Sequence, residues 1–241
     1  MRISFKNKTV VVTGGTKGIG KAIAERFLGS GAHVVVTGRS RNKPSDLDSR
    51  INYISLDLGS STSIREFLKY ITSLDRVDAF VNNVGINVID DLISIKHKDF
   101  DSVLEVNLKG PFIICKHLAS KMGPAGGKIV NIGSIWSKIT KKGRVSYIVS
   151  KAGLAGLTRG LATDLAEKNI LVNTVSPGFV ETELTRRSLS DTEILELTDN
   201  VPLGRLAQAA EIANFVVFLC SDLNSFMTGQ NIVIDGGYTN V

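Results

Sequence analysis

The sequence predicts a doubly wound α/β fold, in which one parallel sheet of about seven strands has helices on both faces. First, short β-branched and apolar runs alternate along the chain with segments of helical periodicity. Second, a glycine-rich turn lies between the first such run and the first helical segment. Third, the 241 residues contain no linker, repeat or low-complexity tract, which predicts one domain spanning 1–241.

The expected strands are short apolar runs of the kind found in buried parallel sheets, at 8–13, 32–37, 51–56, 77–81, 128–134, 171–175 and 231–237. Helical patterns fall between them, at 21–28, 60–73, 100–122, from Tyr147 onward and at 207–220. The polar segment from Ser40 to Arg50 is too short for a full crossover helix, so we expect a loop or a single turn there.

Composition excludes several classes of protein. The net charge of +6 is spread along the chain, whereas nucleic-acid-binding proteins more often show a dense basic stripe. No apolar run reaches transmembrane length, and the N-terminal residues lack the pattern of a signal peptide, which favours the cytoplasm. Cys115 and Cys220 lie far apart in apolar segments, and no histidine has the spacing of a metal ligand. We therefore expect buried thiols and no metal site.

The glycine-rich turn has the spacing of a dinucleotide-binding turn. It runs from Gly14 to Gly20 between a strand and a helix, which is the context that such a turn requires. Gly14 permits the tight turn, Gly18 allows close approach of a pyrophosphate, and Gly20 allows close packing of helix on strand. An ordinary glycine-rich loop is the alternative interpretation.

The end of the second strand indicates which dinucleotide binds. An NAD site usually has an acidic residue there, but this sequence has Gly38 and Arg39. Arg39 can form a fork to a 2′-phosphate, with Lys17 approaching from the glycine turn. The sequence thus predicts NADP(H) rather than NAD(H), the alternative being that Arg39 is simply a solvated surface residue.

Tyr147 and Lys151 are four residues apart and share one face of a helix. A unit charge about 4 Å away contributes roughly 4 kcal/mol at an effective dielectric of about 20. That is enough to lower a tyrosine pKa by up to roughly 3 units before burial opposes it. Taken alone, however, such a pair is more often a solvated contact between neighbours.

Together these motifs resemble the short-chain dehydrogenase/reductase family, whose fold is a Rossmann sheet. The resemblance covers nearly the whole chain and rests on an ordered set: 13–20, Asp57, 82–85, Asn107, Ser134, the Tyr147/Lys151 pair and 177–182. Two departures are visible. Val84 stands where the family usually has alanine, and the segment between the second and third strands is short.

The resemblance implies four catalytic residues. Tyr147 is expected to be the general acid, and Lys151 to lower its pKa and to bond the nicotinamide ribose. Ser134 is expected to polarise a carbonyl, and Asn107 to support a water relay. Pro111, four residues after Asn107, predicts a local irregularity in that helix.

The resemblance also implies a cofactor cleft. Asp57 is expected to contact the adenine, Leu58 to contribute backbone and Thr182 to bond the carboxamide, beneath a lid at roughly 183–205. The full expected set is Gly14, Thr16, Lys17, Gly18, Ile19, Gly20, Arg39, Asp57, Leu58, Asn83, Val84, Gly85, Tyr147, Lys151, Pro177, Gly178, Val180 and Thr182.

The implied activity is NADPH-dependent reduction of a carbonyl to a secondary alcohol. Within the family the chain is most similar to the 3-oxoacyl-[acyl-carrier-protein] reductases, which suggests an acyl-thioester substrate. Those reductases usually have arginines where this chain has Lys121, Lys128 and Lys168. Whether the substrate is attached to a carrier protein therefore stays open. Sugar, steroid and other small alcohols or ketones are alternatives, and a non-catalytic NADP-binding regulator is a remote one.

The small residues that follow Tyr147 in its helix suggest close packing between subunits, as in the family's usual homotetramer, with a homodimer as the other possibility. The expected partners are therefore further copies of this chain and a small substrate, with no membrane and no nucleic acid.

Overall fold

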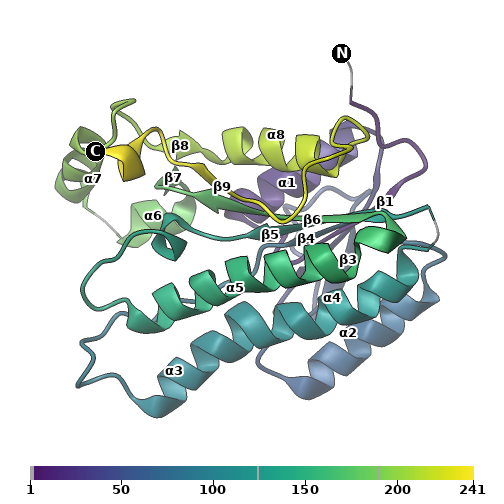
Figure 1. The fold of residues 1–241 in the computed structure, drawn as a ribbon, viewed down its shortest axis with the longest axis horizontal. Coiled ribbons are helices and arrows are strands. Elements are labelled where there is room, and N and C mark those ends of the chain that lie inside the picture. The colour runs from purple at the N-terminus through teal and green to yellow at the C-terminus, as the bar shows by residue number, and fades with distance from the viewer. Residues whose placement is uncertain (1–2, 124, 189) are drawn as a thin grey trace.

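A computed structural model describes residues 3–123, 125–188 and 190–241, and shows a parallel sheet between two layers of helices (Figure 1). The main sheet has seven strands in the order β3-β2-β1-β4-β5-β6-β9, and every neighbouring pair is parallel. This confirms the predicted fold class. The strands are β1 (Thr9–Val12), β2 (His33–Gly38), β3 (Asn52–Ser55), β4 (Ala79–Asn82), β5 (Gly127–Ile132), β6 (Ile170–Pro177) and β9 (Asn231–Ile234).

Side-chain alternation along the strands divides the core into two clusters. In β1, Val10 and Val12 pack with α1 (Gly18–Gly29) and α8 (Ala209–Cys220), whereas Val11 packs on the opposite face. That face is covered by α2 (Ser61–Ser73), α4 (Gly110–Lys121) and α5 (Val145–Asp164). Because strands buried on both faces are apolar at successive positions, they read as continuous hydrophobic runs in the sequence.

The predicted helix at 100–122 is interrupted. It consists of α3 (His97–Leu104), a π-helical turn (Glu105–Lys109) and then α4, in which Pro111 lies in the first turn. The Gly110 N–H donates to the Glu105 carbonyl, five residues earlier. The irregularity predicted from Pro111 is present, since proline has no N–H to donate to the carbonyl four residues before it.

The remaining elements lie near the carboxyl ends of the strands or at turns. The segment 40–50 is a loop, and the predicted lid contains α6 (Glu183–Ser188) and α7 (Asp191–Asp199). Two short strands, β7 (Val180–Glu181) and β8 (Ala207–Gln208), pair in parallel on either side of it. Single 3₁₀ turns occupy Ile135–Ser137, Ala166–Lys168 and Tyr238–Asn240. None of the described helices is long and apolar enough to span a membrane.

We expect Gly20 and Gly29, two of the three glycines of α1, to respond differently to alanine. A Cβ at Gly20 would lie 2.3 Å from the Gly14 carbonyl oxygen, whereas a Cβ at Gly29 would have no neighbour within 4 Å. Gly20→Ala should therefore lower the free energy of unfolding by about 1–3 kcal/mol, the usual cost of overpacking. Gly29→Ala, the matched control, should change it by less than about 0.5 kcal/mol. Urea denaturation checks both, and equal stability of the two variants would contradict the packing described.

Candidate active site

The carboxyl ends of β1, β4, β5 and β6 surround a cavity of about 260 Å³. In an open parallel sheet this edge is where ligands bind. Its lining includes Ser134, Tyr147 and Lys151. The other lining residues come from the glycine turn and from the ends of β4, β5 and β6 and the segments after them: Ile19, Asn83, Gly85, Ile132, Gly133, Pro177, Gly178, Phe179, Val180, Thr182 and Thr185. The structure thus brings three of the four predicted catalytic residues together beside much of the predicted cofactor cleft.

The glycine turn is held in place from β4. Gly14 and Gly18 have φ angles of 64° and 55°, in the left-handed region that favours glycine. The Asn83 amide donates to the carbonyls of Thr13 and Gly14 at 3.1 and 3.2 Å, and the Thr13 hydroxyl accepts from the Asn83 N–H. The side chain of Asn83, predicted to contact the cofactor, therefore fixes the shape of the turn.

A chain of buried amides and hydroxyls lies beneath the cavity. Asn82 donates to Asn131 at 3.2 Å, Asn131 donates to the Thr158 hydroxyl at 2.8 Å, and Thr158 and Thr174 share a 2.6 Å hydrogen bond. Because buried polar groups are costly unless they are paired, this chain fixes the relative positions of β4, β5, β6 and α5. Sequence reasoning missed it, since each residue alone looks like an ordinary strand or helix position.

Ser134 follows β5 and Tyr147 lies in the first turn of α5, so both face the same cavity. The Ser134 oxygen accepts from the Trp136 N–H at 3.3 Å, which leaves its proton available for another acceptor. Lys151 follows Tyr147 by one helical turn. Its ammonium is buried, donates to the Ile132 carbonyl at 2.8 Å, and lies 5.6 Å from the centroid of the Tyr147 ring.

The electrostatics of Tyr147 differ from the prediction. Burial raises its pKa above the ordinary value of 10.0, while a hydrogen bond with Ser134 and the positive charge of Arg144 lower it. The Lys151 ammonium lies over the tyrosine ring and donates to the Ile132 carbonyl. Burial also lowers the pKa of Lys151 to about 8, which lowers the fraction of Lys151 that is protonated near neutral pH.

Asn107 lies in the π-helical turn and is fully buried. Its amide donates to the Ile86 carbonyl at 2.8 Å and to the Ser150 hydroxyl at 3.0 Å, and its oxygen accepts from the Ile86 N–H. Ser150 in turn donates to the Tyr147 carbonyl. The Asn107 side chain thus fixes the first turn of α5, and its predicted role in a water relay stays a prediction.

The loop after β6 closes against the glycine turn. A Cβ at Gly18 would meet the Thr182 methyl group at 3.6 Å. The Thr182 hydroxyl accepts from the Thr185 N–H and bonds its hydroxyl at 3.0 Å. Together with Pro177, Gly178 and Val180, Thr182 lines the same cavity as Tyr147, as the predicted cleft requires.

The predicted adenine side lies outside this cavity. Arg39 and Lys17 are exposed, and neither side chain makes a hydrogen bond or ion pair among the described residues. The Asp57 carboxylate accepts from the Gly59 N–H at 2.9 Å, whereas the Leu58 side chain is buried, so that only its backbone is available to a ligand.

Comparison with known proteins gives the family. A profile described as "Enoyl-(Acyl carrier protein) reductase" matches residues 14–239. A 3-oxoacyl-[acyl-carrier-protein] reductase FabG of Aquifex aeolicus (strain VF5) is 38% identical, over 98% of this chain and 99% of that protein. The protein of that name from Escherichia coli (strain K12) is 36% identical, over 98% of each chain. This chain belongs to the short-chain dehydrogenase/reductase family.

Solved structures agree with this membership. A gluconate 5-dehydrogenase from Burkholderia cenocepacia J2315, in complex with NADP and tartrate, has a TM-score of 0.92 and 28% identity, with 100% of this chain and 98% of that chain covered. A short-chain dehydrogenase/reductase from Serratia marcescens BCRC 10948 has a TM-score of 0.90 and 29% identity, with 98% and 99% covered. As a member of the family, the chain is an oxidoreductase, as predicted.

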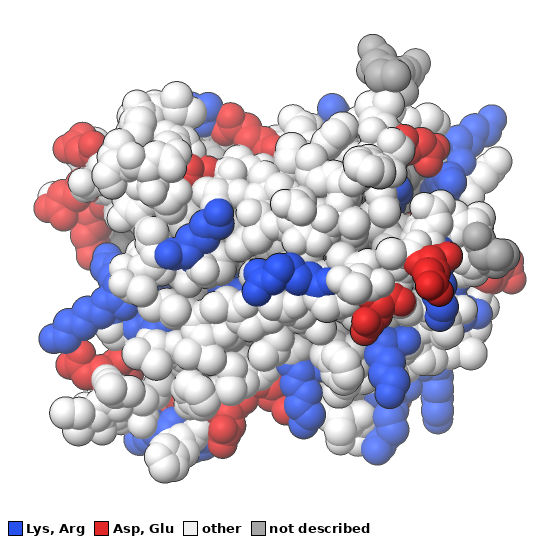
Figure 2. Space-filling view, viewed as in Figure 1, with Lys and Arg blue, Asp and Glu red and all other residues white. Residues whose placement is uncertain are grey.

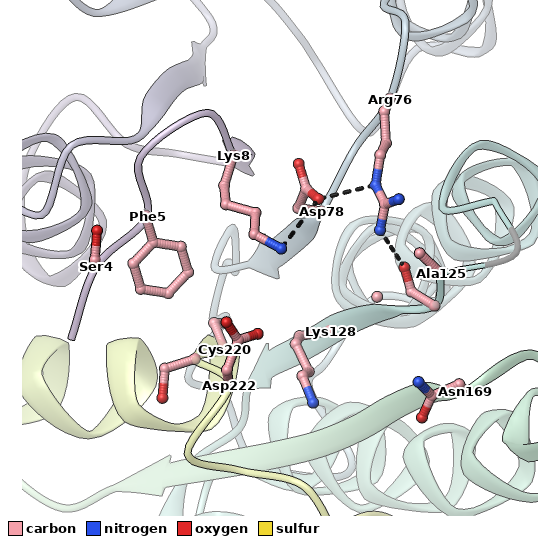
Figure 3. A pocket seen from close by; sticks show the side chains of 13 residues that line it. Ser4, Phe5, Lys8, Arg76, Asp78, Ala125, Lys128, Asn169, Cys220 and Asp222 are labelled. Atoms are coloured by element: carbon pink, nitrogen blue, oxygen red, sulfur yellow. Dashed lines mark hydrogen bonds and ion pairs between the residues drawn. The ribbon is translucent and has the colours of Figure 1, made fainter.

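A second, smaller cavity of about 60 Å³ lies where β1, β4 and β5 begin, at the opposite edge of the sheet (Figure 3). Here Asp78 pairs with Arg76 at 2.8 Å and with Lys8 at 3.8 Å. Neither a predicted catalytic residue nor a predicted cofactor residue lines it. In a family whose chemistry takes place at the carboxyl ends of the strands, this cavity is not the active site.

The two cysteines add no reactive group to the site. Cys115 and Cys220 are free and buried, and burial raises the pKa of each thiol to about 12. Such thiols are protonated at neutral pH and inert. Among the described residues, no group of histidine, cysteine or acidic side chains could hold a metal ion.

Proposed function

We propose that this chain reduces the carbonyl of a 3-oxoacyl thioester to a secondary alcohol with NADPH. The observation behind the proposal is that one cavity joins the glycine turn, Ser134, Tyr147 and Lys151. The substrate class comes from the relatives, which are named 3-oxoacyl-[acyl-carrier-protein] reductases at 34–38% identity over nearly the full chain.

The residues present fit a dinucleotide. The glycine turn leaves backbone N–H groups free at the start of α1, and the space beside Gly18 contains only the Thr182 side chain within 4 Å. When bound there, NADPH supplies the hydride. Gly14, Thr16, Ile19, Gly20, Val84 and Gly85 would hold one side of it, and Pro177, Gly178, Val180 and Thr182 the other.

The protein itself supplies the proton for the reaction and holds the substrate in position. The Ser134 hydroxyl donates a hydrogen bond to the substrate carbonyl oxygen, which fixes and polarises the carbonyl. Tyr147 gives its phenolic proton to the developing alkoxide, and the high pKa caused by burial keeps that proton in place until it is needed. Lys151 bonds the ribose and, with a pKa of about 8, returns a proton to Tyr147 by way of a water at the Asn107 carbonyl.

Tyr147→Phe tests this assignment. Removal of the phenolic proton should lower kcat for an acetoacetyl thioester by about 10²–10⁴-fold, with NADPH affinity nearly unchanged. NADPH oxidation at 340 nm and nucleotide fluorescence titration measure the two quantities. Tyr70→Phe, on α2, is the matched control. Wild-type turnover by the Tyr147 variant would overturn the assignment.

The alternatives are tested with the same assay on sugar ketones, steroids and small ketones. A gluconate 5-dehydrogenase with NADP and tartrate bound has a very similar fold, so a hydroxy-acid or keto-acid substrate is the second candidate. Failure of the pure protein to reduce any carbonyl would instead favour a regulator that binds NADP without catalysis.

Arg39 supports the preference for NADP(H) over NAD(H). Arg39 directly follows β2, and its side chain is exposed and makes no ion pair among the described residues. Arg39→Gln should raise the KM for NADPH about 10–100-fold, because each hydrogen bond between charged groups is worth about 1.5–3 kcal/mol. The KM for NADH should be unchanged, and Arg41→Gln is the control. Faster turnover of NADH than of NADPH by the wild-type enzyme at equal low concentration would contradict this.

We also propose that α4 and α5 join copies of this chain into a homotetramer or a homodimer. Figure 2 shows a broad uncharged surface crossed by a few basic side chains on the side where these helices lie. Phe112 and Val149 are 45% and 43% exposed, and a Cβ at Gly160 would have no neighbour within 4 Å. Close packing against another copy would account for both features. Sedimentation as a monomer at micromolar concentration would contradict it.

The enzyme is proposed to act in the cytoplasm without a membrane or nucleic-acid partner. Segment 183–205, with α6 and α7, is proposed to be the lid over the substrate, since it follows Thr182 directly. Cell fractionation tests the location, and substrate protection of this segment from proteolysis tests the lid.

A further inference from the structure

Arg144 is the residue immediately before α5, three positions ahead of Tyr147. Its guanidinium carbon lies 5.4 Å from the centroid of the Trp136 ring, the distance of a cation–π contact. Sequence reasoning did not list Arg144 among the site residues. The signal that could have singled it out is its place immediately before the helix that carries Tyr147.

The ring beneath Arg144 packs directly behind the site. Trp136 is buried, and its backbone N–H donates to the Ser134 hydroxyl oxygen. Its ring makes a T-shaped contact with Phe179, with 6.4 Å between centroids, and Phe179 lines the cavity. Arg144 thus packs on a ring that contacts the lining of the cavity, and it immediately precedes the helix that carries Tyr147.

The charge of Arg144 has no acidic partner among the described residues. Lys142, two residues earlier, pairs with Asp91 at 3.7 Å, but Arg144 forms neither an ion pair nor a side-chain hydrogen bond. Its guanidinium is partly buried and offers five N–H donors in a fork. Its field reaches the Tyr147 oxygen, whose pKa it lowers. A cation so placed is available to an oxygen atom of the substrate.

We propose that Arg144 binds a second oxygen of the substrate, carried by the carbon on the far side of a methylene group from the carbonyl that is reduced. Ser134 and Tyr147 hold the reacting oxygen, and Arg144 receives the acyl or carboxylate oxygen on the other side of a methylene group. This inference rests on the proposed function and narrows it. The preferred substrates are 3-oxoacyl compounds, and simple ketones are poor substrates because they leave the guanidinium unpaired.

The test compares wild type, Arg144→Gln and Arg144→Lys on three ketones: the N-acetylcysteamine thioester of acetoacetate, acetoacetate itself, and cyclohexanone. Arg144→Gln should lower kcat/KM about 10–100-fold on an acetoacetyl compound and less than about 3-fold on cyclohexanone, since a charged hydrogen bond is worth about 1.5–3 kcal/mol. Arg144→Lys should recover part of the loss because it keeps the charge without the fork.

Lys141→Gln is the matched control, because it removes one exposed positive charge from the same segment. Thermal unfolding and NADPH affinity of each variant separate a folding or cofactor defect from a substrate defect. A loss confined to acetoacetate assigns a carboxylate, a loss confined to the thioester assigns an acyl carbonyl, and either supports the inference. The wild-type enzyme could also reduce both acetoacetyl compounds and show no activity on cyclohexanone. That result supports the inference if Arg144→Gln loses the expected kcat/KM on the acetoacetyl compounds.

Two results would contradict the inference in different ways. Equal losses on all three ketones, or full efficiency of Arg144→Gln on both acetoacetyl compounds, would overturn the role of Arg144 and leave the proposed function intact. A wild-type enzyme that reduces cyclohexanone but neither acetoacetyl compound would overturn both.

Discussion

The hydrogen bond from the Lys151 ammonium to the Ile132 carbonyl is the contact on which the site depends. It is 2.8 Å long, buried, and connects helix α5 to the last residue of strand β5. Burial of an ammonium costs free energy, and the lowered pKa of Lys151, about 8, reflects that cost. The bond places Tyr147, one turn earlier on α5, beside Ser134, which follows β5 by two residues.

Other buried contacts hold the same two elements in register. The chain of hydrogen bonds from Asn82 through Asn131 to Thr158 links β4, β5 and α5, and Asn107 reaches the first turn of α5 through Ser150. The buried, hydrogen-bonded polar side chains beneath the cavity give it a fixed shape. Substrate choice is proposed to depend on Arg144 and on the segment 183–205.

Much of the fold could be predicted because its signals are local. β-Branched runs and glycine spacing each depend on a few neighbouring residues, and the structure has the strands and the glycine turn that they predict. The π-helical turn at 105–109 was only partly foreseeable, since Pro111 predicts an irregularity but not its kind. The small β7–β8 pair was missed because two-residue strands have no periodicity.

The site residues could be predicted as a set, but their interactions could not. Spacing suggests a lowered pKa for Tyr147, whereas burial raises that pKa and outweighs the opposing effects of Ser134 and Arg144. The Asn83 amide donates to the carbonyls of Thr13 and Gly14, which spacing did not indicate, and its contact with the cofactor stays a prediction. Such assignments depend on where side chains point after packing, which residue spacing along the sequence does not determine.

The pKa of Tyr147 in the cofactor-free enzyme tests the account most directly. Carbon-13 NMR of ring-labelled tyrosine follows the four tyrosines through a pH titration, and loss of one signal in Tyr147→Phe assigns the resonance. The account predicts that less than half of Tyr147 is ionised at pH 10.0, and still less in Arg144→Gln, because burial raises the pKa and Arg144 lowers it. A midpoint below 10.0, or one that Arg144→Gln leaves unchanged, would contradict it.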